Sequence, residues 1–272
     1  VTVQPHWALL PVRRPPLIEG ERAIDHFVHA RLAEHGVHVA VEADRRTLVR
    51  RLTLDLTGLP PRPDEVERFV ADRDPKSYER LVDRLLASPQ YGERQAQHWL
   101  DVVRFTESDG FEEDMQRKNA WTYRDYVIQA FNEDVPYDRF VREQIAGDVM
   151  EPVTSRSIAA TGFLVAGAWD ALQRVTPSPL GRLQSREEEL EEMVGAVGQT
   201  FLGLTVQCAR CHDHKFDPVL QREYYAMKAV FEGVDHGLVA KRHGERRMLS
   251  REEDARWELG TKGLRESLMG LD

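Results

Sequence analysis

Both cysteines of the chain lie in one short stretch, residues 208–214 (CARCHDH). Two residues separate the thiols, and a histidine follows the second thiol directly, which is the Cys-x-x-Cys-His signature of covalent c-type haem attachment. In such a site the thiols add across the two vinyl groups of the porphyrin, and the adjacent histidine becomes the proximal iron ligand. The motif therefore predicts one covalent haem c, carried by Cys208 and Cys211, with iron held by His212.

Two other interpretations of the motif stay open. A Cys-x-x-Cys pair can form a redox disulfide, but that arrangement usually accompanies a βαβ pattern, which the sequence lacks. The run can also supply half of a zinc site through Cys208, Cys211 and either His212 or His214. A structural zinc site usually draws its second ligand pair from a distant segment, and the chain has no third cysteine. The sequence favours haem over both alternatives.

The second axial position of the iron determines the chemistry of a haem site. His98 lies on a predicted helix far from the motif and is our leading candidate metal ligand from the opposite face, although helix histidines are more often surface or core residues. Met227 is a second candidate. His214 is too close to His212 to reach that face, so we expect it to contact a haem propionate or to fix the loop. Arg210 lies inside the motif, and its guanidinium suits a propionate carboxylate.

Composition narrows the classes of partner. The chain has 272 residues, 41% of them hydrophobic, and a formal net charge of -9. Such an acidic chain is not expected to bind nucleic acid, whereas it can dock on a basic patch of a redox partner. No apolar run approaches the roughly 20 residues that span a bilayer. The sequence begins with Val1 rather than methionine, which indicates a processed chain or a fragment of a longer one.

Apolar residues recur at helical spacing through most of the chain, and strand signals are few. We expect a mainly α fold: an irregular helical domain with long loops around a single c-type haem. Residues 1–22 are rich in proline and read as an extended arm or linker, 23–234 as the helical haem domain, and 235–272 as a charged tail or the start of a further segment. The helices that we expect lie at 24–35, 45–57, 66–70, 77–86, 92–104, 121–131, 137–145, 185–201 and 224–231. Asp44 is the expected N-cap of the second helix, and Leu81, Leu85 and Leu86 are expected to face inward from the fourth. Ser185 and Glu188 form a capping-box pattern at the start of the helix at 185–201.

Several stretches occur together in a familiar order: 24–28 (IDHFV), 43–48 (ADRRTL), 52–60 (LTLDLTGLP), 91–94 (YGER), 98–101 (HWLD), 119–121 (NAW), 123–127 (YRDYV) and 208–218 (CARCHDHKFDP). Over roughly residues 7–234 they resemble the planctomycete cytochrome-c-associated family, a bacterial domain of unknown function. The resemblance implies a portion of a larger exported protein, in which a small cytochrome c module commonly precedes the domain. Members often occur alongside sulfatases and polysaccharide-degrading systems, which hints at carbohydrate oxidation.

We expect an exported mono-haem c-type cytochrome domain that transfers electrons. It would be periplasmic or otherwise exported, because this kind of attachment takes place outside the bacterial cytoplasm. Its partner would be a redox protein, either a neighbouring cytochrome c domain or an oxidoreductase. One alternative is a haem enzyme with an open distal site, peroxidase-like or sugar-oxidising, whose substrate side is formed by residues 98–117. Another is a non-haem module stabilised by zinc.

Overall fold

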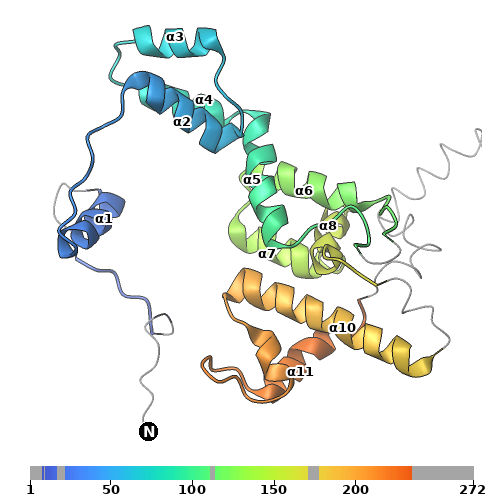
Figure 1. Cartoon of the computed structure of the whole chain (residues 1–272). Coiled ribbons are helices and arrows are strands. Elements are labelled where there is room, and N and C mark those ends of the chain that lie inside the picture. Colours follow the sequence, from blue (N-terminus) through green and yellow to red (C-terminus); the bar gives the residue numbers. More distant parts are fainter. Residues whose placement is uncertain (1–7, 9, 17–21, 111–113, 171–177, 235–272) are drawn as a thin grey trace, which may run out of the picture. The chain divides into compact units, whose positions relative to one another are not determined.

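The computed structural model describes residues 8, 10–16, 22–110, 114–170 and 178–234. Within these ranges the chain is built from helices joined by loops, and the only strand-like pairing is an isolated antiparallel bridge between Ser108 and Gln116 (Figure 1). The predicted mainly α class is therefore confirmed. No helix in the described part of the chain combines the length and apolar content that a bilayer crossing requires. The predicted tail at 235–272 lies outside the described residues.

The chain divides into two compact units, residues 1–48 and 49–272. The first unit contains α1 (Ala23–Glu34), which confirms the first predicted helix and buries none of its side chains. It also contains the start of α2 (Arg45–Thr57), where the Asp44 carboxylate accepts a hydrogen bond from the backbone N–H of Thr47 at 3.1 Å. That contact is the N-cap that the sequence predicts.

Three helices of the second unit carry buried side chains outside its main core. These are the rest of α2, α3 (Pro63–Ala71) and α4 (Ser77–Leu86). Val49, Phe69, Leu81 and Leu85 are buried but do not join the main core. Leu86, which the periodicity placed inside with Leu81 and Leu85, is instead 41% exposed, because it follows Leu85 directly and turns to the next face of the helix.

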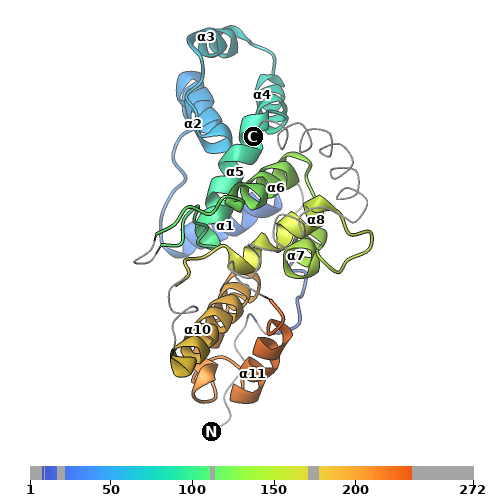
Figure 2. The same cartoon turned by 90° about the vertical axis from the view of Figure 1, so that its right-hand side faces the viewer.

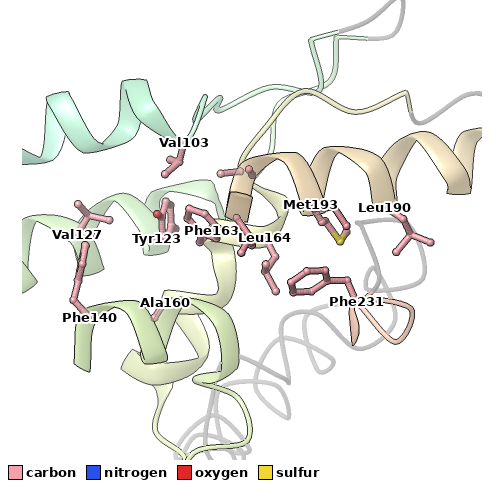
Figure 3. Close-up of a cluster of buried hydrophobic side chains, with 14 of the residues drawn as sticks. Val103, Tyr123, Val127, Phe140, Ala160, Phe163, Leu164, Leu190, Met193 and Phe231 are labelled. Atoms are coloured by element: carbon pink, nitrogen blue, oxygen red, sulfur yellow. The ribbon is translucent and has the colours of Figure 1, made fainter. Parts of the chain in front are cut away.

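The main core of the second unit lies between two groups of helices. The first group comprises α5 (Pro89–Val102), α6 (Ala120–Asn132), α7 (Tyr137–Ala146), α8 (Ser155–Ala160) and the 3-10 helix η2 (Thr161–Val165). The second comprises α10 (Pro179–Val197) and α11 (Gln221–Val230), which lie side by side (Figures 1 and 2). Figure 3 shows apolar side chains from both groups in one cluster, among them Val103, Tyr123, Phe163, Leu164, Leu190, Met193 and Phe231.

The start of α10 differs from the prediction. The Ser185 and Glu188 pair resembles a capping box, but Ser185 is a buried residue in the middle of the helix. The N-cap is Ser178, whose hydroxyl accepts a hydrogen bond from the N–H of Gly181 at 3.2 Å, and Pro179 occupies the first helical position. Proline is well suited to that position because its missing N–H would have no partner there. The helix therefore begins six residues earlier than the sequence pattern indicates.

Arg117 links the described residues of the polar segment after α5 to the end of η2. The Arg117 side chain donates from Nε to Asp109 at 3.1 Å and from its terminal nitrogens to the carbonyl oxygens of Val165 and Gly167 at 3.1 and 2.8 Å. The Arg117 and Asp109 side chains are 15% and 8% exposed. This part of the proposed substrate side at 98–117 is therefore a structural clamp at the end of η2.

We expect Arg117→Met to destabilise the fold by about 3–5 kcal/mol, because it leaves the Asp109 carboxylate buried without its charge partner. Arg124→Met is the matched control, since Arg124 pairs with Glu107 and Asp125 at the surface and such pairs contribute about 0–1 kcal/mol. Urea denaturation of both variants measures the difference. Equal, small losses of unfolding free energy in the two variants would contradict this account.

Candidate haem-attachment site

The Cys-x-x-Cys-His stretch follows α10 after a short irregular connection. The helix continues into one π-helical segment, η3 (Gly198–Leu202), and ends at Gly203, which has a left-handed φ of 65°. Glycine is the residue that adopts this conformation without strain, so it terminates the helix at this point. The chain then turns into the 3-10 helix η4 (Val206–Arg210), which carries the first cysteine.

Packing of η4 determines where the thiols point. Val206 and Ala209 are buried, at 4% and 0% exposure, whereas Cys208 and Cys211 are exposed. A 3-10 helix has three residues per turn, so residues three apart share a face. Burying Val206 and Ala209 therefore places Cys208 and Cys211 together on the outer face.

Two glycines of α10 and η3 allow η4 to approach closely. A Cβ atom at Gly198 would lie 2.5 Å from the Val206 side chain, and one at Gly195 would lie 2.2 Å from the Gln207 side chain. Real Cβ contacts are essentially never that short. At Gly195 the flexible Gln207 side chain could move aside, whereas at Gly198 a larger residue would press on the branched Val206 side chain and on the Leu204 backbone and would push the turn outward. The buried side of η4 thus depends on small residues in the preceding helix.

The residues predicted to bind the cofactor line one cavity of about 610 Å³. This volume lies within the range of small-molecule sites, roughly 300–1,000 Å³. Sequence reasoning missed Glu191 and Gln207, which come from α10 and η4 and lie outside the motif. The lining residues are Glu191, Gln207, Cys208, Arg210, Cys211, His212, His214, Lys215 and Phe216.

The ring of His212 is oriented by a backbone group. Its Nδ1 lies 2.8 Å from the carbonyl oxygen of Asp213. A carbonyl oxygen can only accept, so Nδ1 carries the hydrogen and the lone pair is left on Nε2. Histidines that bind metals usually donate their second ring N–H in this way, which fixes the tautomer and the ring direction. His212 is exposed and lines the cavity, and its arrangement fits that of a proximal ligand.

His214 has the opposite arrangement. Its side chain is 6% exposed, and Nδ1 accepts hydrogen bonds from the backbone N–H groups of Phe216 at 3.2 Å and Asp217 at 2.7 Å. The hydrogen of the neutral ring must then be on Nε2, which lies 3.1 Å from the Thr205 hydroxyl. Neither nitrogen has a free lone pair for iron. Of the two roles expected for His214, the hydrogen bonds correspond to fixing the loop.

Helix α11 holds the other side of the motif. The backbone N–H of Gln221 donates to the Asp213 carboxylate at 2.9 Å, at the start of the helix, where a negative charge is favourable. The Gln221 amide and the Tyr225 hydroxyl both donate to the carbonyl oxygen of Arg210, at 3.1 and 3.2 Å. The Arg210 guanidinium itself pairs with Glu191, and this neighbouring carboxylate raises the pKa of Arg210. Arg210 is therefore engaged with a protein carboxylate, and its contact with a haem propionate stays a prediction.

The family described as PSCyt2, protein of unknown function (DUF1549), matches residues 23–236. The chain belongs to this family. The match includes the whole cavity and all helices from α1 to α11. No curated protein and no solved structure matches the chain. The PSCyt2 family is described as having unknown function, so the reaction has to be inferred from the residues of the site.

The structure does not bring the predicted distal residues to the cavity of this PSCyt2 domain. His98 is exposed on α5 and is not among the lining residues. Its neighbour Trp99 turns the other way and donates from Nε1 to the Gln144 side chain at 2.9 Å. Met227, on α11, packs against the main core and does not line the cavity either.

The zinc alternative needs a group of metal-binding side chains. In the ranges that the structure covers, no three His, Cys, Asp or Glu side chains gather closely enough to hold a metal ion. A covalent c-type haem has a smaller requirement, because the thiols bind the porphyrin and a single histidine binds the iron. The residues present fit haem attachment better than a structural zinc site.

Tyr224 lies under the motif on α11 and is 1% exposed. Burial, with a smaller contribution from the Glu191 carboxylate, raises the pKa of Tyr224 to about 12 from the ordinary value of 10.0. The unfolded chain therefore loses this proton first, and the stability that the group provides is complete below pH 10 and declines as the pH rises towards 12.

We expect Tyr224→Phe, which cannot ionise, to lose unfolding free energy less steeply than the wild type between pH 10 and pH 12. Urea denaturation at fixed pH values measures both slopes. Parallel profiles for the wild type and the variant would contradict the raised pKa.

Proposed function

We propose that the domain carries one covalent haem c on Cys208 and Cys211, with His212 as the proximal ligand, and that it transfers electrons. The observation that supports this most is the shared outer face of the two thiols, next to a histidine whose Nε2 lone pair is free. These three groups line one cavity of ligand size.

Haem c supplies a one-electron iron couple when it is bound. The chain's own residues provide the attachment and the surroundings. The two cysteine thiols hold the porphyrin edge, and the Asp213 carbonyl orients the His212 ring. Glu191 and Lys215 place charges of opposite sign on the cavity wall, and Phe216 contributes an apolar ring that is 83% exposed. A porphyrin held on this exposed face would be within reach of a partner protein.

The cellular setting follows from the attachment chemistry. Covalent haem of this kind is added outside the bacterial cytoplasm, so we propose a periplasmic or otherwise exported domain. Its partner would be a redox protein, either a neighbouring cytochrome c domain or an oxidoreductase, which docks over the cavity. The resemblance to the planctomycete cytochrome-c-associated family supports this setting, together with a role in carbohydrate oxidation.

A haem enzyme with an open distal site is the second candidate, and the cavity lining favours it. Apart from His212, the lining contains one histidine, whose ring nitrogens are both engaged, and no methionine. The described residues therefore offer no His or Met ligand for the second axial position at this cavity. An open position would permit ligand binding or peroxide chemistry.

Replacing both Cys208 and Cys211 by alanine removes the attachment points, so we expect complete loss of the haem absorbance that survives acid extraction. His212→Ala keeps the thiols but removes the proximal nitrogen. We expect this variant to retain covalent haem with a changed Soret band and spin state. The measurement is an absorption spectrum, oxidised and reduced, of protein matured in a host with the haem-attachment machinery. A His212→Ala spectrum identical to the wild type would contradict the proximal assignment.

The wild-type spectrum also separates the two candidates. A low-spin spectrum indicates two axial ligands and supports electron transfer, whereas a high-spin spectrum indicates an open iron and supports the enzyme.

A further inference from the structure

One buried side chain connects the two ends of the segment that carries the motif. The His214 ring contacts Thr205, just before η4, and the backbone N–H groups of Phe216 and Asp217, just after the motif. The backbone N–H of His214 also donates to the carbonyl oxygen of Val219 at 2.8 Å. Cys208, Cys211 and His212 all lie between these contacts, so the ring of His214 closes the loop that presents them.

The two histidines of the loop hold opposite tautomers. His212 has its hydrogen on Nδ1 and exposes Nε2, whereas His214 has its hydrogen on Nε2 and uses the Nδ1 lone pair inside the loop. His214 could bind iron only after giving up its contacts with Thr205 or with Phe216 and Asp217. The same hydrogen bonds that hold the loop therefore leave His212 as the available ligand.

We propose that His214 is a positioning residue that fixes the attachment loop by itself, without haem, and thereby determines which histidine binds the iron. This inference concerns the site of the proposed function and rests on it for the part that involves iron. The contacts that carry this inference are those of the His214 ring with Thr205, Phe216 and Asp217. The anchors on α11, from Gln221 to Asp213 and to the Arg210 carbonyl, hold the loop from its other side.

Two substitutions of His214 separate positioning from ligation. In His214→Asn the side-chain oxygen falls near the position of Nδ1 and can accept both backbone N–H groups, but it is a poor iron ligand. His214→Leu offers no acceptor and leaves both N–H groups unpaired. His38→Asn, at an exposed histidine of the first unit, is the matched control.

The first readout is amide hydrogen exchange of Phe216 and Asp217 in the purified chain. We expect slow exchange in the wild type, His214→Asn and the control, and at least about tenfold faster exchange in His214→Leu, because the acceptor is lost. Long-range ¹H–¹⁵N spectra of the wild type, which need no variant, should show the hydrogen of His214 on Nε2. A hydrogen on Nδ1, or equal exchange in all four proteins, would overturn the proposal.

The second readout is the covalent haem content and the spin state of the haem-loaded chain. We expect His214→Asn to match the wild type in covalent haem content and spin state, and His214→Leu to fall in haem content. A changed spin state in His214→Asn, with the control unchanged, would show that His214 binds iron and would overturn the proposal. If the wild type itself takes up no covalent haem, the proposed function fails, and the exchange and tautomer measurements still decide whether His214 holds the loop.

Discussion

The outward direction of both cysteines depends on the close packing of one 3-10 turn against the end of α10. Gly198 leaves room for Val206, and the threefold repeat of η4 then turns Cys208 and Cys211 to the surface. His214 and the start of α11 close the rest of the loop. The positions of the two thiols and of His212 thus follow from packing and hydrogen bonds that the protein makes with itself.

The cavity lies beside the core and not within it. The buried cluster of α5 to α11 is completed by protein side chains, including an aromatic series in which the rings of Phe163 and Phe201 are 4.9 Å apart. Cys208 and Cys211, which would hold the proposed haem, are exposed beside this core. Exposure of a haem influences its reduction potential, and it shortens the path to a partner. Both consequences would support the electron transfer that we propose.

Much of the fold could be predicted from the sequence because helical periodicity, proline and glycine positions are local signals. Asp44 as an N-cap and the helices at 121–131 and 137–145 are examples. The beginning of α10 was predicted wrongly because Ser185 and Glu188 match a capping box, whereas the true cap at Ser178 has no glutamate or glutamine three residues later. The local sequence pattern alone does not distinguish a capping-box sequence inside a helix, as at Ser185, from an actual N-cap, as at Ser178.

The motif residues that line the cavity could also be identified from the sequence, because they are nearly contiguous in it. The partners that orient them could not, because Glu191 and Thr205 carry no motif of their own and reach the loop only through the packing of α10 and η4. Distance in sequence made His98 a reasonable distal candidate, but the direction of a helix face depends on tertiary packing. Trp99 packs against the core, and His98 faces solvent.

The most direct test of covalent haem at Cys208 and Cys211 is the intact mass of the chain, measured under denaturing conditions after maturation in a host with the haem-attachment machinery. The account predicts a mass increase of one haem, located by proteolysis on the peptide that contains both cysteines and His212. An unmodified mass, from a host shown to mature another c-type cytochrome, would contradict it.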